Sequence, residues 1–168
     1  MGVTPRITLR PATESDVRLI VELVHELAGY ERLAHECVAD AESVQRALFE
    51  TKAAEVILAE VGGDTAGYAL FFRSFSTFLM RPGIYLEDLF VRPAFRKQGV
   101  GFALLRHLAR HALDQGYARV EWSVLNWNQL AIDFYEQIGA EALSGWTTFR
   151  LSGESLDALA RRATASDS

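Results

Sequence analysis

The segment from Gly83 to Gly116 constrains the fold most, because one continuous stretch has the pattern of a strand, a turn and a helix. Its first part, GIYLEDLFV, places β-branched, aromatic and aliphatic residues around one acidic pair and ends before Pro93, which cannot continue a sheet ladder. From Gly101 to Ala112 apolar residues recur at steps of three and four and form one helical stripe. Gly116 is placed as a C-terminal cap of that helix.

A basic, glycine-bearing loop, Arg96-Lys97-Gln98-Gly99-Val100-Gly101, joins this strand to this helix. The first N–H groups of a helix have no partner inside it, and the helix dipole adds partial positive charge there, so a phosphate is a natural ligand. Glycines remove the Cβ atoms that would hold a ligand away from the backbone. With Arg92 as a further positive charge, the loop predicts an anion cradle. A glycine-bearing turn with solvated basic residues is the alternative.

Two well-known phosphate-binding loops do not match this segment. A Walker loop ends in Gly-Lys-Ser/Thr, whereas Gly101 is followed by Phe102 and Ala103. A dinucleotide-binding fingerprint needs a third glycine where this chain has Leu104, and no early βαβ unit precedes the loop.

Hydrophobic periodicity and turn residues predict the elements outside this segment. Strands are predicted at 6–10, 55–61, 66–73, 119–125 and 146–151. Helices are predicted from a cap at Thr13 to Gly29, at 40–49, from a cap at Asn128 to Gly139, and at 154–162. The turn at 62–64 makes its two flanking strands antiparallel. The pattern indicates an α/β fold in the wider sense, with a mixed, mostly antiparallel sheet flanked by helices.

Length and composition favour one globular domain at residues 4–162, followed by a short tail at 163–168. The chain has 168 residues, of which 49% are hydrophobic and 23% charged, and its longest apolar run is far short of a membrane span. A formal net charge of -5 argues against nucleic acid and favours a cationic small molecule. The single cysteine, Cys37, fits a reducing, cytoplasmic compartment. The four histidines show no metal-ligand pattern.

The loop resembles the acetyl-CoA loop of the GNAT acetyltransferase superfamily, whose pattern Arg/Gln-x-x-Gly-x-Gly/Ala matches Arg96, Gly99 and Gly101. In that family the motif also follows a strand and opens a long helix. The resemblance implies that the N–H groups of the loop hold the pyrophosphate of acetyl-CoA. It also implies that the end of the strand pairs with the pantetheine arm, through Leu89, Phe90 and Val91.

Acetyl transfer to an amine asks for a carboxylate beside the amine and a proton donor beside the thioester. Glu87 and Asp88 lie in the middle of the strand. Consecutive strand residues face opposite sides, so one is expected to face the cofactor and the other to face away, unless a bulge brings both to it. A solvated acidic pair on an edge strand is the alternative.

The stretches LEDLFV and FYEQIGA resemble segments of diamine acetyltransferases within that superfamily. The resemblance implies that Glu87 relays the proton of the amine and that Asp88 contacts the cationic acceptor. It implies that Tyr135 is the general acid for CoA; a core tyrosine with its hydroxyl at the rim is the alternative.

Three further positions complete the resemblance. Asn128, in a Trp-Asn pair, would contact the cofactor, although it also fits as a helix cap. Tyr30 and Glu31 match a Tyr-Glu pair that would line the acceptor side. The likeness covers nearly the whole chain, with a departure at Asn126, where many relatives are expected to have an acidic residue.

The sequence therefore predicts an acetyl-CoA-dependent N-acetyltransferase that transfers acetyl directly to a diamine, a polyamine or a thialysine-like acceptor. A homodimer is expected from the resemblance. The alternatives are a non-catalytic acetyl-CoA-binding module, a GNAT enzyme acting on a peptide N-terminus or an aminoglycoside, and an unrelated binder of a phosphate ligand.

Overall fold

The computed structural model describes residues 6–162, and the predicted tail at 163–168 lies outside them. The described residues fall into two compact units that divide between Leu125 and Asn126. The first unit contains, in chain order, β1 (Ile7–Pro11), η1 (Glu14–Asp16), α1 (Val17–Tyr30), η2 (Ala34–Glu36), α2 (Ala41–Val44), η3 (Gln45–Glu50), β2 (Glu55–Val61), β3 (Asp64–Ser76), β4 (Arg81–Val91), η4 (Pro93–Phe95), α3 (Val100–Asp114) and β5 (Val120–Trp122).

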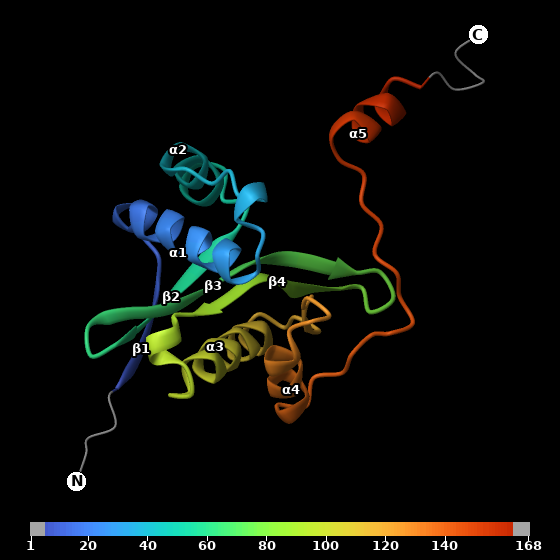
Figure 1. Cartoon of the computed structure of the whole chain (residues 1–168). Helices are drawn as coiled ribbons and strands as arrows, with labels where there is room; N and C mark the ends of the chain where they lie inside the picture. The colour runs from blue at the N-terminus through green and yellow to red at the C-terminus, as the bar shows by residue number, and fades with distance from the viewer. Residues whose placement is uncertain (1–5, 163–168) are drawn as a thin grey trace. The chain divides into compact units, whose positions relative to one another are not determined.

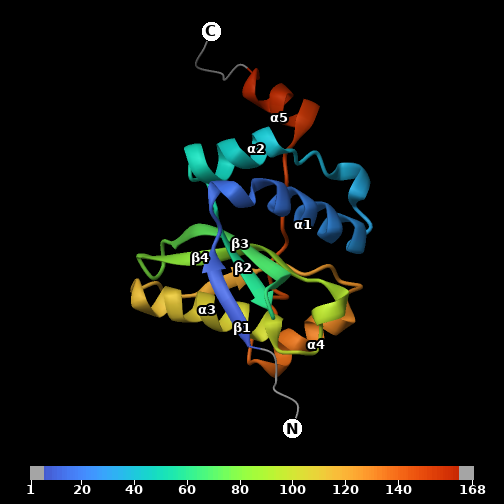
Figure 2. The same ribbon diagram turned by 90° about the vertical axis from the view of Figure 1, so that its left-hand side faces the viewer.

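The strands of the first unit form one five-stranded sheet in the order β1-β2-β3-β4-β5. The first four strands pair antiparallel with their neighbours, and β5 pairs parallel with β4. Helices α1 and α2 lie on one face of this sheet and α3 lies on the other, as the two ribbon views show (Figures 1 and 2). The predicted mixed, mostly antiparallel sheet flanked by helices is confirmed.

Each face of the sheet buries the apolar stripe of a helix, since a stripe at three- and four-residue steps places its members on one side. The stripe of α1 packs with residues of β2, β3 and β4, and that of α3 is equally buried. The buried residues of α1 are Val17, Ile20, Leu23 and Leu27, and those of α3 are Val100, Leu104, Leu105, Leu108 and Ala112.

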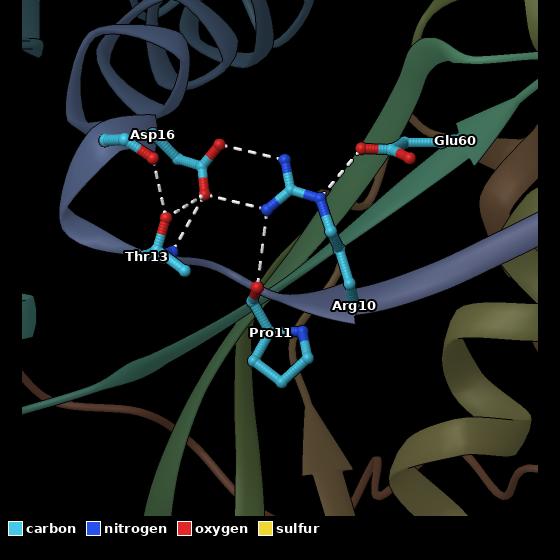
Figure 3. A network of polar contacts seen from close by, with 6 residues as sticks. Arg10, Pro11, Thr13, Asp16 and Glu60 are labelled. Atoms are coloured by element: carbon cyan, nitrogen blue, oxygen red, sulfur yellow. Dashed lines mark hydrogen bonds and ion pairs between the residues drawn. The ribbon is translucent and has the colours of Figure 1, made fainter.

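A polar network ties β1 to the start of α1 (Figure 3). The guanidinium of Arg10 donates to both carboxylate oxygens of Asp16, at 2.8 and 2.9 Å, and its Nε donates to Glu60 of β2 at 2.8 Å. Asp16 also accepts from the backbone N–H and the hydroxyl of Thr13. These hydrogen bonds, that from Arg10 above all, hold the pKa of the buried Asp16 carboxyl well below its usual range.

Strands β3 and β4 approach each other unusually closely at Gly67. A Cβ atom built at this glycine would lie 2.2 Å from the carbonyl oxygen of Phe90. No side chain fits at that distance, so the absence of a Cβ atom is what permits the contact.

Four local predictions need correction in this unit. The strand predicted at 119–125 is shorter, because β5 includes only Val120–Trp122. Helix α1 continues past Gly29 to Tyr30, and the chain turns at Arg32, which has φ of 63°. The helix predicted at 40–49 begins as α2 but continues as a π-helix at Gln45–Glu50, where the Thr51 N–H donates to the Arg46 carbonyl. The strand predicted at 66–73 extends to Ser76. Strands β3 and β4 therefore form a long hairpin, and the end of this hairpin is apolar and exposed. The most exposed side chain there is Phe78, at 95%.

The second unit contains α4 (Gln129–Gln137) and α5 (Gly153–Ala160), close to the two predicted helices. The strand predicted at 146–151 is wrong, because these residues form neither strand nor helix. Alternating side chains set which way residues face, but a strand also needs a neighbouring strand to pair with. Residues 126–162 contain no strand at all, so this unit supplies no partner with which residues 146–151 could pair.

Candidate active site

A β-bulge in β4 decides where the acidic pair lies. Leu86 is opposite Phe71 of β3 and Asp88 is opposite the preceding Leu70, so Glu87 is an extra residue between two successive pairs. Leu86 shares its face with Phe71, which packs toward α3, whereas Asp88 shares its face with Leu70, which packs toward α1. Without the bulge, Leu86 and Asp88 would face the same side. The bulge considered from the sequence is present.

Asp88 lies against a buried tyrosine that sequence reasoning did not select. The hydroxyl of Tyr68 donates to Oδ2 of Asp88 at 2.9 Å, and Tyr68 is completely buried. Burial raises the pKa of Asp88 to about 6, while the hydrogen bond from Tyr68 lowers it and the negative charges of Glu87 and Glu31 raise it further. A tyrosine inside the apolar run YALFF was the available signal, but only the register of β3 with β4 brings it to Asp88.

The negative charges of Glu31 and Glu87 both act on Asp88, and we call these three residues the acidic cluster. Burial also raises the pKa of Glu31, which follows α1. A nearby cation stabilises the charged form of a carboxyl group, so the acidic cluster favours a positively charged ligand.

Tyr30 and Arg96 lie together next to β4. The Arg96 guanidinium carbon lies 4.5 Å from the centre of the Tyr30 ring, and this ring lies 6.5 Å from that of Phe90. The Nε of Arg96 also donates to the Val91 carbonyl at 3.0 Å. Tyr30, predicted on the acceptor side, and Arg96, predicted in the cofactor loop, are thus direct neighbours. Arg96 packs on an aromatic ring and on the end of β4.

The predicted loop leads into α3 through a left-handed residue. Gly99, the N-cap, has φ of 83°, and α3 begins at Val100. The side chain of Val100 is buried in the core, so this residue can offer a ligand only its backbone N–H. Gln98 turns back, and its amide donates to the Ala94 carbonyl at 3.1 Å. The first N–H groups of a helix have no partner inside it and suit an anion, so the predicted binding of a pyrophosphate at the start of α3 stays a prediction.

Arg92 does not contribute to the positive charge of this loop as expected. Its guanidinium donates to Glu26 and Glu22 of α1, and to the carbonyl of Thr65. Two carboxylates therefore neutralise Arg92, which links the end of β4 to α1.

Strand β4 extends beyond the residues that pair with β5. Strand β5 pairs with β4 over Ile84–Leu86, so within the described part of the chain this pairing ends before the bulge. Residues 87–91 of β4 include the predicted pantetheine-binding positions Leu89, Phe90 and Val91. The backbone groups of a strand edge can bond an extended ligand that contains amides, as pantetheine does.

The other two predicted site residues belong to the second unit. Asn128 caps α4, and its side-chain oxygen accepts from the Ala131 N–H at 3.3 Å. Tyr135 lies within α4, with its ring centre 5.5 Å from that of Phe134. The capping alternative for Asn128 is confirmed. The cofactor role of Asn128 and the acid role of Tyr135 stay predictions.

Neither a membrane helix nor a metal-binding cluster appears at residues 6–162. None of the helices there is long and apolar enough to cross a membrane. The same residues contain no group of three or more potential His, Cys, Asp or Glu ligands.

Comparisons with known proteins support an acetyltransferase fold and family for this chain. The sequence model of the acetyltransferase (GNAT) family matches residues 20–140. The chain is 36% identical to thialysine N-epsilon-acetyltransferase of Bos taurus, over 92% of this chain and 97% of the relative. It is 32% identical to an L-ornithine N5-acetyltransferase of Arabidopsis thaliana, over 90% and 86% of the two chains.

A solved structure supports the fold. An integron cassette protein of V. cholerae superposes with a TM-score of 0.79 at 25% identity, over 96% of this chain and all of the other. The match to the family model covers most of the chain and crosses the boundary between the two units. The resemblance seen in the sequence is confirmed: the chain belongs to the GNAT family of N-acetyltransferases.

Proposed function

We propose that this protein transfers the acetyl group of acetyl-CoA directly to a primary amine of a small aliphatic cation. The observation that carries the proposal is the acidic cluster, in which Glu87 and Asp88 at the bulge of β4 are joined by Glu31 after α1. Its three carboxyl groups favour a cation at the edge of β4, where the pantetheine arm would end.

The cosubstrate would be held by two features of the first unit. The N–H groups at the start of α3, after Gly99, suit the pyrophosphate, and Lys97 adds positive charge. The β4 edge past β5 suits the amides of pantetheine. Acetyl-CoA supplies the activated acetyl group, and we propose no metal.

The chemistry needs two proton transfers. An alkylammonium with a pKa of about 10.4 is neutral in only about one molecule in 2,500 at pH 7. Glu87, exposed at the bulge, would accept the proton of the ammonium, directly or through water. The amine nitrogen would then form a bond to the acetyl carbon while the carbon–sulfur bond breaks. Tyr135 would give its proton to the departing thiolate.

The acceptor is proposed to be a diamine, a polyamine or an amino acid of the lysine type. Two relatives carry names that specify thialysine and ornithine, both of which have an amine on a short aliphatic chain. In this proposal Asp88, Glu31 and Tyr30 bind the acceptor, and the amine reacts beside Glu87.

A steady-state panel tests the proposal: putrescine, spermidine, spermine, lysine, ornithine, thialysine, an aminoglycoside and a peptide with a free N-terminus. We expect the highest kcat/KM for an aliphatic amine. A preference for the peptide or the aminoglycoside would refute the acceptor assignment.

Calorimetry with CoA, acetyl-CoA and ATP tests the cosubstrate. Binding of acetyl-CoA without turnover of any amine would indicate a non-catalytic module.

We also propose that residues 4–162 act as one catalytic domain, and that the protein works in the cytoplasm as a homodimer. The family match across both units supports the first point, and the sequence resemblance supports the dimer. Light scattering at several concentrations would measure the oligomeric state, and a mass of one chain throughout would refute the dimer.

A further inference from the structure

We propose that Tyr68 is a positioning residue for the acceptor: its hydroxyl holds the Asp88 carboxylate in place and in its charged form. This inference rests on the proposed role of Asp88 in binding the acceptor cation. Tyr68 lies on β3, outside the sequence motifs that suggested the site, so nothing in the proposed mechanism yet uses it.

The geometry makes Tyr68 a rigid anchor. Its side chain has no exposed surface and belongs to the core between α1 and the sheet. Its ring centre lies 6.4 Å from that of Phe90, the residue opposite it on β4. The hydroxyl reaches Oδ2 of Asp88 at 2.9 Å. Because the ring cannot move without disturbing the core, the position of its hydroxyl is set by the fold.

The hydrogen bond has a fixed direction. Burial, together with the negative charge of Asp88, raises the pKa of Tyr68 far above its ordinary value, so the phenol stays protonated and donates. An ionised carboxylate only accepts hydrogen bonds and has more than one lone pair on each oxygen, so an acceptor ammonium can bind to it at the same time. Tyr68 therefore orients Asp88 without occupying its full binding capacity.

The other groups near Asp88 explain why this donor matters. Glu87, its neighbour on β4, and Glu31, after α1, both disfavour a charged Asp88, and so does burial. The hydrogen bond from Tyr68 on β3 acts against all three, because it favours the charged carboxylate. The electrostatic effect of Cys37 raises the pKa of Tyr68 further, so the phenol stays protonated. Loss of the hydroxyl would leave Asp88 with neighbours that favour its neutral form, which attracts a cation poorly.

The test is Tyr68→Phe, which keeps the ring and removes only the hydroxyl. A hydrogen bond to a charged group changes an equilibrium by about ten- to a hundredfold, so the titration midpoint of Asp88 should rise by about one to two pH units. At pH 7 the charged fraction of Asp88, and with it 1/KM for thialysine, should fall by about two- to tenfold. The change in KM should nearly vanish at pH 9, and kcat at saturating thialysine should change little.

The midpoint is measured from the carboxyl carbon shift of Asp88 by NMR, without substrate, in wild type, in Tyr68→Phe and in Tyr85→Phe. The Tyr85 hydroxyl pairs with Ser123 at 2.9 Å, so its removal is a matched control that should leave the midpoint unchanged. An unchanged midpoint in folded Tyr68→Phe would overturn the inference.

A measurement on the wild type covers the case in which the variant does not fold. The Tyr68 hydroxyl proton should exchange slowly, and its chemical shift should follow the titration of Asp88; a shift independent of pH between 5 and 8 would overturn the inference. The proposed function fails separately: if Asp88→Asn leaves the KM for thialysine unchanged, Asp88 does not bind the acceptor, whatever the NMR titration shows.

Discussion

Replacement of Asp88 by Asn should make the protein more stable at neutral pH while weakening its binding of the acceptor. The wild-type carboxyl is half-buried and shares its surroundings with the charges of Glu31 and Glu87. Asn removes the charge but keeps an oxygen that can accept the hydrogen bond from Tyr68. The substitution therefore removes the unfavourable electrostatics and leaves the local geometry in place.

The magnitude follows from the pKa of Asp88, which is about 6 in the folded protein. An unfolded aspartate has a pKa of about 3.9, and one pH unit of difference corresponds to about 1.4 kcal/mol. Because the folded pKa is the higher one, wild-type stability falls as pH rises from about 4 to about 6 and is constant above that range. Full ionisation therefore destabilises the wild type by about 3 kcal/mol at pH 8, and by well under 1 kcal/mol at pH 4.

The assay is urea denaturation of wild type and Asp88→Asn at pH 4 and at pH 8. The stability gained by the variant should be larger at pH 8 than at pH 4 by about 2 to 3 kcal/mol. Burial of the Asn amide costs free energy that does not depend on pH, so this cost cancels in the comparison. Asp64→Asn removes one negative charge at an exposed position and serves as the control.

A gain that is the same at both pH values would refute the reasoning, since it would mean that Asp88 titrates alike in the folded and unfolded chain. A gain equal to that of Asp64→Asn would show that only the net charge of the protein matters.

Four further predictions can be tested directly. Tyr135→Phe should lower kcat by about 10²- to 10⁴-fold with acetyl-CoA affinity nearly unchanged, and a rate within about twofold of wild type would remove it from the mechanism. Gly101→Leu, at the start of α3, should weaken acetyl-CoA binding in calorimetry while the circular dichroism spectrum stays that of a folded protein; unaltered affinity would argue against the cradle. Asp16→Asn should destabilise the fold by about 2 to 3 kcal/mol at pH 7. Because the folded pKa of Asp16 is depressed, this loss should shrink as pH falls below about 4, and a loss independent of pH would contradict the ion pair. Gly67→Ala should lower the thermal midpoint markedly, because its Cβ would meet the Phe90 carbonyl oxygen at 2.2 Å; an unchanged midpoint would mean that β3 and β4 can separate there without cost.

The sequence alone determined most of the local structure. Strand β2 has the predicted bounds of 55–61, and α3 follows its apolar stripe to a left-handed Gly116. Such features are readable because they depend on side-chain period and on the backbone freedom of glycine, both of which are local properties. The motif resemblance also identified the family and the acidic pair at Glu87 and Asp88.

Tertiary structure decided what those residues face. The bulge at Glu87 depends on the register between β3 and β4, and it turns Asp88 toward Tyr68 and the end of α1. The neutralisation of Arg92 depends on two glutamates of α1, some 66 and 70 residues earlier in the chain. Strand pairing also decided against the strand predicted at 146–151, whose alternating pattern has no partner strand in its own unit. These outcomes rest on contacts between residues that are distant in sequence, and a hydrophobic period specifies a face but not the neighbour that covers it.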